Sequence, residues 1–188
     1  HTYSAHCWRN ERCGKIYSSR KLYSMDLKMN GQYDLEIVRP MACADISQVV
    51  EIERQVKFHP WAQNAFSECL KAGYQCWVID SDDQVIAYIV PSFYCEESYM
   101  LNLAVNSTQQ GHGLGRGLVK KACVDAAKNG VVKVLLEVRS NNLIVRQFYE
   151  SEGFLVFGRR NNYYHSSGQT EDALAMEQVL GPASVMMQ

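Results

Sequence analysis

Residues 102–122, NLAVNSTQQGHGLGRGLVKKA, decide the fold, because an apolar strand, a glycine-rich loop and a helix start follow one another there. The glycines at positions 111, 113, 115 and 117 alternate with other residues. A helix N-terminus exposes backbone N–H groups and carries about half a positive charge, so it binds anions. Glycine lets a phosphate approach these groups and permits positive φ angles. The stretch therefore predicts a pyrophosphate cradle to which Arg116 adds positive charge, although a tight, flexible turn also fits the spacing.

The composition of the 188 residues, 47% hydrophobic and 21% charged, is typical of a globular domain. No apolar run approaches the roughly 20 residues of a membrane helix, so we expect no membrane contact. The seven cysteines are odd in number and contain no CxxC pair. This pattern favours reduced thiols in a cytoplasmic protein over a disulfide framework, and it suggests no metal site.

Charge is distributed unevenly along the chain. Residues 1–28 hold six Lys or Arg and two Asp or Glu, hence +4, whereas residues 29–188 hold thirteen and eighteen, hence −5. The acidic balance of the longer part argues against direct nucleic-acid binding and permits a basic partner. Residues 1–28 show no periodicity, and we expect a leader that is disordered or outside the domain, with a basic interaction arm as the alternative. Residues 29–188 are expected to form one domain.

The periodicity from residue 33 onward predicts a mixed α/β domain. Apolar spacing and turn residues indicate helices at 44–56, 60–73, 115–130 and 142–154, and strands at 33–40, 74–80, 84–95, 97–105, 132–139, 154–165 and 171–180. We expect Asp45 to cap the first helix, and Pro60 and Gly73 to bound the second. The strand at 132–139 is apolar almost throughout, which is typical of a central strand.

Two common phosphate loops do not fit the glycine stretch, because it contains neither GxxxxGK[ST] nor GxGxxG. The pattern Gln110-x-x-Gly113-x-Gly115 after NLAV instead resembles motif A of the GNAT acetyltransferases. The segments LLEVRSNN, FYESEGF, RRNNYYH and EDALAM, with HPW upstream, narrow the resemblance to the ribosomal-protein-alanine N-acetyltransferases of that family. It spans about residues 34–180. It implies an α/β GNAT fold: a mixed, mostly antiparallel sheet, splayed between its fourth and fifth strands and flanked by helices.

The resemblance also implies acetyl-CoA as co-substrate. Pantetheine would pair with the strand end at 103–105, the loop at 111–116 would hold the pyrophosphate, and an asparagine would contact the cofactor further along. NSTQ at 106–109 and the histidine at 112 depart from the usual family pattern, and this histidine is equally well read as merely exposed. The implied cofactor residues are Leu103, Ala104, Val105, Gly111, His112, Gly113, Leu114, Gly115, Arg116 and Asn142.

Transfer to an amine requires a base, because a free α-amino group has a pKa near ~8 and is mostly protonated at neutral pH. Glu137 is the candidate, at the carboxyl end of an apolar strand, although an ion pair with Arg139 fits the spacing as well. The resemblance assigns Tyr149 as the acid that protonates the leaving thiolate, whereas its helical stripe alone suggests a core tyrosine. A nucleophilic Cys95 or Cys123 is a rival mechanism with no histidine pattern to support it.

We therefore expect an enzyme that acetylates the N-terminal alanine of a small-subunit ribosomal protein through its basic N-terminal peptide. The alternatives are a broader N-terminal or lysine acetyltransferase and a catalytically silent acyl-CoA-binding module. Trp61, Tyr163 and Tyr164 are candidates for the rim of the acceptor site, and edge-strand or helix-end packing explains them equally well.

Overall fold

The computed structural model describes residues 37–166 and 169–181. The predicted leader at residues 1–28 lies outside this range, as does the first part of the predicted strand at 33–40. In chain order the elements are β1 (Ile37–Pro40), the 3-10 turn η1 (Cys43–Asp45), α1 (Ile46–Val56), α2 (Gln63–Lys71), β2 (Trp77–Ser81), β3 (Gln84–Tyr94), β4 (Glu97–Val105), the 3-10 turn η2 (Ser107–Gln109), α3 (Leu114–Lys128), β5 (Lys133–Arg139), α4 (Leu143–Ser151), β6 (Leu155–Ser166) and β7 (Gln169–Val179).

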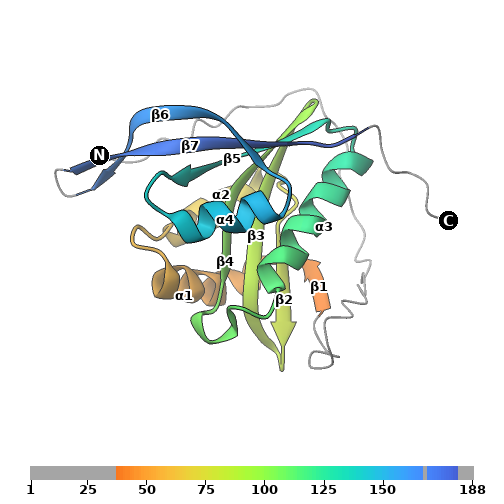
Figure 1. Cartoon of the computed structure of the whole chain (residues 1–188). Coiled ribbons are helices and arrows are strands. Elements are labelled where there is room, and N and C mark those ends of the chain that lie inside the picture. Colours follow the sequence, from red (N-terminus) through yellow and green to blue (C-terminus); the bar gives the residue numbers. More distant parts are fainter. Residues whose placement is uncertain (1–36, 167–168, 182–188) are drawn as a thin grey trace.

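The order of elements confirms the predicted mixed α/β fold, and the sheet has the order β1-β2-β3-β4-β5-β7-β6. The β4–β5 pair is parallel, and the other neighbouring strands are antiparallel. Helices α1 and α2 cover one face of the sheet, and α3 and α4 lie on the other (Figure 1). The central strand β5 was correctly predicted from its apolar run.

Two details of the helix boundaries differ from the sequence prediction. Pro60 does not start the second helix, which begins at Gln63 after an extended Ala62. Asp45 precedes α1 but does not cap it, because its carboxylate accepts bonds from the Ala42 N–H at 2.7 Å and from Arg39 at 2.7 and 2.8 Å. The Arg39 guanidinium and the Ala42 N–H thus occupy the carboxylate that was expected to cap the helix.

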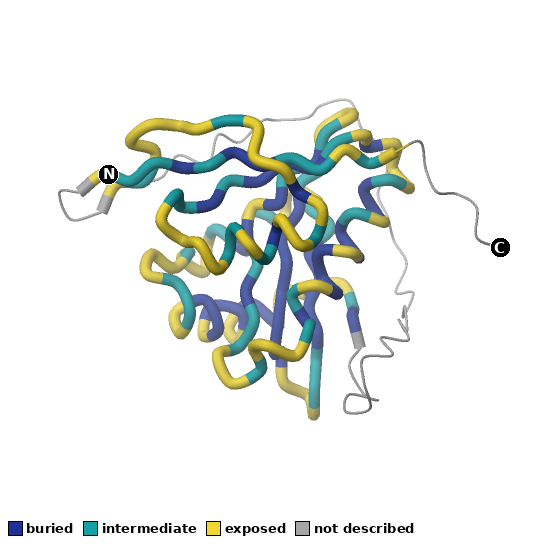
Figure 2. Tube along the Cα trace, viewed as in Figure 1, coloured by how far each residue is buried: buried dark blue, intermediate teal, exposed yellow. Residues whose placement is uncertain are grey.

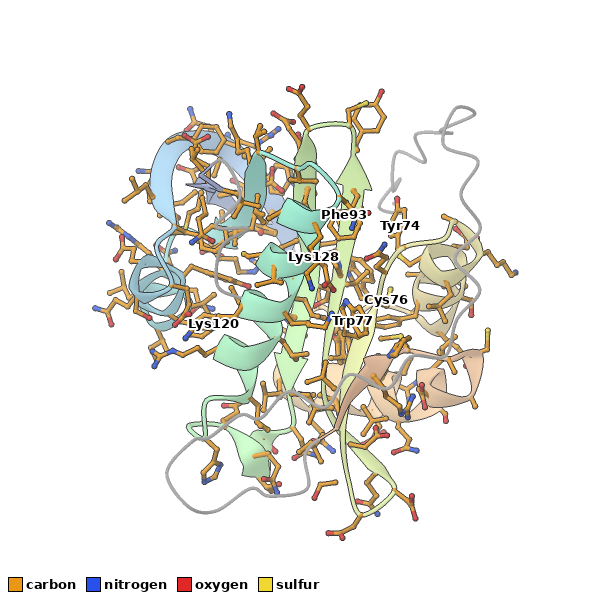
Figure 3. The ribbon with its side chains drawn as sticks, turned by 90° about the vertical axis from the view of Figure 1, so that its right-hand side faces the viewer. Tyr74, Cys76, Trp77, Phe93, Lys120 and Lys128 are labelled. Atoms are coloured by element: carbon orange, nitrogen blue, oxygen red, sulfur yellow. The ribbon has the colours of Figure 1, made fainter. Side chains whose placement is uncertain are left out.

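Two hydrophobic clusters, one on each face, form the core. Figure 2 shows that the buried residues lie mainly along the central strands and on the helix segments next to them. The cluster under α3 and α4 includes Trp77, which lies beside α3 in Figure 3. The Lys121 ammonium sits 3.6 Å from the centre of the Trp77 ring and also pairs with Asp125 one turn further along α3. Among the helices in the described ranges, none has the length and apolar character needed to cross a membrane.

The sheet splays between β4 and β5, as the resemblance implies. Over the described residues, the ladder between them joins Glu97–Tyr99 to Lys133–Leu135 and then stops. At the same level the β3–β4 register shifts, so that Leu101 is an extra residue on β4. A bulge of this kind bends a strand and ends its pairing. The strand end that follows remains paired with β3 alone, and this divergence positions the functional site.

Candidate functional site

The first wall of the site is the end of β4 at residues 103–105. Leu103 and Val105 are half-buried, whereas Ala104 is buried. Their Cα partners lie on β3, and the Gln110 side-chain amide donates to the Val105 carbonyl at 3.2 Å. The edge of β4 that faces β5 is thereby left to an extended ligand, which suits the predicted pairing with pantetheine.

The glycines of the loop serve two different purposes. Gly111 and Gly113 have φ angles of +80° and +83°, a region that side chains rarely adopt. Gly113 is also the N-cap of α3 and has no side chain with which to cap the first turn. A Cβ at Gly115, by contrast, would lie 3.5 Å from the Phe148 ring and 3.7 Å from Val105. The loop thus combines close helix packing with a helix N-terminus, the kind of position that binds anions in proteins.

His112, Leu114 and Arg116, which lie next to these glycines, have different surroundings. His112 is exposed, and its Nδ1 lies 3.2 Å from the carbonyl oxygen of Gln109. Leu114 is buried in the core, so it can offer a ligand only its backbone. The Arg116 guanidinium is bound by Glu152 at the end of α4, at 2.5 Å. The positive charge predicted for the cradle is therefore already shared with a carboxylate.

Asn142 is the N-cap of α4, a role that sequence reasoning missed. Its Oδ1 accepts the backbone N–H of Val145 at 3.2 Å. An Asn immediately before an apolar helical run is a cap signal that was available in the sequence. Its predicted contact with the cofactor stays a prediction, and it would use the amide nitrogen.

Glu137 lies on the sheet face opposite to α3 and α4, since its neighbours Leu136 and Val138 pack in the cluster beneath those helices. Its carboxylate accepts the Tyr163 hydroxyl at 3.4 Å and pairs with Arg160 at 3.1 Å. The ion pair that the sequence allowed with Arg139 is not formed in the structure, where Arg139 pairs with Glu171. Both observed partners of Glu137 come from β6, which is distant in sequence.

Tyr149 lies on the other face of the sheet, in the cluster under α3 and α4. It is buried in α4, with 7% of its surface exposed, between the rings of Phe148 and Phe154. Burial raises the pKa of the Tyr149 phenol, and the nearby Tyr164 adds to the effect. Tyr164 in turn donates to the backbone carbonyl of Glu137 at 3.4 Å. Tyr164 therefore connects the proposed acid with the strand of the proposed base.

A bulge in β6 places the two tyrosines. Arg160 pairs with Ala173 and Tyr164 with Glu171, so the three residues between them face Asp172 alone. Asp172 accepts the Asn162 N–H at 2.8 Å and Arg159 Nε at 2.7 Å, while Asn162 adopts a φ of +53°. Both contacts lower the pKa of Asp172, the Asn162 N–H first. Asp172 was missed in the sequence, where only the NN pair hinted at a tight bend.

Trp61, the third rim candidate, lies between α1 and α2. Its backbone N–H donates to Glu53 at 3.0 Å, and its ring is 5.4 Å from that of Phe66. The structure thus shows the helix-end packing that the sequence left open, and these contacts join Trp61 to α1 and α2 rather than to Glu137 or Tyr149. Glu53, which holds it, was not singled out from the sequence, because one glutamate in an amphipathic helix carries no signal.

Candidate ligands for a metal are not clustered in the described part of the chain: no group of three or more His, Cys, Asp or Glu residues could hold an ion there. The cysteines within the same residues are free thiols, namely Cys43, Cys69, Cys76, Cys95 and Cys123. Burial, followed by the charge of Glu152, raises the pKa of Cys123 to about 11. A thiol in this state is a poor nucleophile at neutral pH.

Comparison with known proteins agrees with this geometry. Residues 44–154 match the acetyltransferase (GNAT) family. The chain is 28% identical over 142 residues to the ribosomal protein bS18-alanine N-acetyltransferase of Escherichia coli K12, covering 76% of this chain and 96% of that protein. The crystal structure of the Escherichia coli ribosomal-protein-S18-alanine N-acetyltransferase has a TM-score of 0.74 at 26% identity and covers 82% of this chain and 99% of that one.

A more distant likeness concerns the fold alone. The structure of yncA from Salmonella typhimurium with its cofactor acetyl-CoA has a TM-score of 0.68 at 19% identity, and covers 82% of this chain and 99% of that chain. The family match, the relative and the splayed sheet lead to one conclusion. The chain belongs to the acetyltransferase (GNAT) family, and the protein is an acetyltransferase.

Proposed function

We propose that this protein transfers the acetyl group of acetyl-CoA to the N-terminal alanine α-amine of a small-subunit ribosomal protein, with Glu137 as general base and Tyr149 as general acid. The observation that carries the proposal is that these two groups come from opposite faces of the sheet. Glu137 faces away from α4, and Tyr149 lies on α4. Tyr164 donates to the backbone carbonyl of Glu137, and it adds to the effect of burial in raising the pKa of Tyr149. A thioester between β4 and β5 would have a base on one side and an acid on the other.

The proposed donor site consists of the end of β4 at residues 103–105 and the glycine loop at 111–116. The edge of residues 103–105 would pair with pantetheine, and the first-turn N–H groups of α3 would bind the pyrophosphate. Arg116 would join them by turning from Glu152 towards the phosphate, since nearly half of its side chain is exposed. His112 and Asn142 would be further contacts of the cofactor. No metal is needed for any of these roles.

The acceptor amine must lose a proton before it attacks. In the proposed reaction the Glu137 carboxylate takes that proton, directly or through a water, and the amine nitrogen then bonds to the thioester carbon. The nitrogen loses its second proton to solvent as the carbon–sulfur bond breaks. The Tyr149 hydroxyl gives its proton to the departing thiolate and regains one from solvent. Tyr149 is protonated at neutral pH, as a tyrosine with an ordinary pKa near ~10 already is, and burial raises its pKa further.

The cysteine mechanism has less support. Attack by Cys123 would need a thiolate, and its pKa of about 11 leaves little of that form at neutral pH. Its thiol also donates to the Gln178 side chain at 3.2 Å, on the side of α3 that packs against β7. Direct transfer needs no acyl-enzyme, so no step is left for this residue.

The proposed acceptor rests on the relatives and on charge. The Escherichia coli relative is named for the alanine of a ribosomal protein, and an excess of five acidic groups in residues 29–188 favours a basic peptide. Tyr163 and Tyr164 would flank its N-terminus, because the β6 bulge sets them beside Glu137. Trp61 would line the rim from the other side. A ribosomal substrate places the reaction in the cytoplasm, without direct binding to nucleic acid or membrane.

The test is a mass-spectrometric comparison of two arginine-rich peptides. One begins with a free alanine, and the other is blocked at its N-terminus and carries one internal lysine. We expect the free peptide to be acetylated on its α-amine at least ~100-fold faster, a difference of about 2.7 kcal/mol in transition-state binding. Equal rates would favour a lysine acetyltransferase, and no turnover of either peptide despite acetyl-CoA binding would favour the silent module.

A further inference from the structure

The carboxylate of Glu53 is the most deeply buried charged group in the described part of the chain, with 1% of the residue exposed. A buried carboxylate is costly unless hydrogen bonds replace its water. Glu53 accepts from the Tyr88 hydroxyl, from Asn102 Nδ2 at 3.0 Å and from the Trp61 N–H at 3.0 Å. The three donors belong to β3, to β4 and to the connection between α1 and α2. One side chain on α1 thus joins three separate elements.

The hydrogen bond from the Trp61 N–H to Glu53 holds the α1–α2 connection. Trp61 is held through its backbone by Glu53, and its ring packs 5.4 Å from that of Phe66. The Phe66 ring meets Tyr88 edge-on at 5.4 Å, and the Tyr88 hydroxyl returns to Glu53. These four residues form a closed ring of contacts. Within this ring, the bond from the Trp61 N–H to Glu53 is the one that holds the connection between the helices directly.

The hydrogen bond from Asn102 to Glu53 holds β4 at the point where it diverges from β5. Asn102 lies between the bulge residue Leu101 and the strand end that begins at Leu103. Its side-chain amide is buried and bound by the same Oε1 atom of Glu53 that accepts the Trp61 N–H. A single oxygen thereby sets the distance between the connection that carries Trp61 and the strand at the splay.

We propose that Glu53 is a positioning residue for the acceptor site, holding the α1–α2 connection against β4. The inference rests on the proposed function, in which this connection is one side of the acceptor rim. Glu53 is too deeply buried to touch a substrate. All three partners donate to it, so the reach of its side chain matters more than its charge: a glutamine can accept from Trp61 and Asn102 and donate to the Tyr88 oxygen.

The test compares Glu53→Gln, which keeps the length, with Glu53→Asp, which keeps the charge and loses the reach. Glu53→Asp is expected to raise the KM for the acceptor peptide at least about tenfold, as for one lost hydrogen bond. The KM for acetyl-CoA should change less than about threefold, and Glu53→Gln should stay within about threefold of wild type for both substrates. In parallel, amide hydrogen exchange over residues 57–62 should accelerate in Glu53→Asp and not in Glu53→Gln.

Tyr88→Phe is the matched control, because it removes one donor to Glu53 and leaves the bonds to Trp61 and Asn102. It should lower the melting temperature without raising the peptide KM. A peptide KM that follows the melting temperature across all three variants, or a Glu53→Gln that fails like Glu53→Asp, would overturn the proposal. If Glu53→Asp does not fold, fast exchange of the Trp61 amide in the wild type would overturn it.

Failure of the proposed function is distinguishable from failure of this inference. A wild-type enzyme that prefers lysine to an N-terminal alanine contradicts the function, and the KM ratio is then measured with lysine as acceptor. If the wild type acetylates neither peptide, hydrogen exchange over residues 57–62 decides alone whether Glu53 holds the connection.

Discussion

Glu53 and Glu137 lie on the same side of the sheet and use their carboxylates in opposite ways. Glu53 is enclosed, and each of its three donors is part of the core or of the backbone. Glu137 is partly exposed. Its partners are the hydroxyl of Tyr163 at 3.4 Å and the long side chain of Arg160, which is itself 55% exposed. A carboxylate with rigid, buried donors holds structure, whereas one with long, solvated partners can exchange them for a substrate amine.

The sharpest test of this difference compares the kcat and the melting temperature of two variants, Glu137→Gln and Glu53→Gln. Glu137→Gln removes the proposed base and is expected to lower kcat by about 10²- to 10⁴-fold, with little change in melting temperature. Glu53→Gln makes the same chemical change in the enclosed site and should leave kcat close to wild type. Steady-state kinetics and thermal melts of both proteins check the prediction. A Glu137→Gln enzyme of normal activity would remove the base from the mechanism.

The same comparison can be made between Tyr149 and Tyr88, with a smaller expected loss of kcat. Tyr149→Phe removes the proposed acid and should lower kcat by about 10²-fold while acetyl-CoA binding persists, because only the transition state needs that proton. Tyr88→Phe removes a hydroxyl bound to Glu53 and should affect stability instead. Rates and calorimetric binding are measured for both. If Tyr149→Phe retains its rate and Cys123→Ala is inactive, direct transfer is wrong.

Ligand binding at the glycine loop should stabilise the molecule. Acetyl-CoA at a hundredfold excess over Kd is expected to add about 2.7 kcal/mol to the free energy of unfolding. Desulfo-CoA should act similarly, because the pyrophosphate anchors both ligands at α3. Gly113→Ala strains a residue with φ +83° and should weaken both effects. Thermal unfolding with and without each ligand checks this, and a folded protein that shows no shift with either would exclude the cradle.

The smallest expected effect concerns alkaline pH. Burial raises the pKa of both Tyr88 and Tyr149, with Glu53 adding to the shift at Tyr88 and Tyr164 at Tyr149. Below a pH of about 10, tyrosine is protonated in the folded and unfolded states alike, so the two residues give no pH dependence. Above it the unfolded chain ionises first, and stability should fall by up to about 1.4 kcal/mol per pH unit for each tyrosine.

Urea titrations at several alkaline pH values, followed by phenolate absorbance, measure this slope. Tyr149→Phe and Tyr88→Phe should each make it shallower. A slope unchanged in both variants would show that neither phenol resists ionisation in the folded protein.

Local patterns predicted the elements well, because strands and helices follow from periodicity and turn residues over a few positions. The strand at 97–105 was predicted with its observed bounds, and the glycine loop was correctly placed before a helix. The predicted Asp45 cap failed because Arg39, from β1, binds the carboxylate instead. The start of α2 was missed for a related reason: the connection before it is held by Glu53, on the preceding helix.

The sequence by itself determined the α/β order of elements, the family resemblance and the candidates Glu137 and Tyr149, since these depend on local pattern and motif. Only the tertiary structure decided which groups face them. The bulge at Leu101 ends the β4–β5 ladder, the bulge in β6 brings Tyr163 to Glu137, and Arg160 takes the place that Arg139 was expected to fill. Such partners come from distant strands whose register is set by packing, and no local pattern encodes that register.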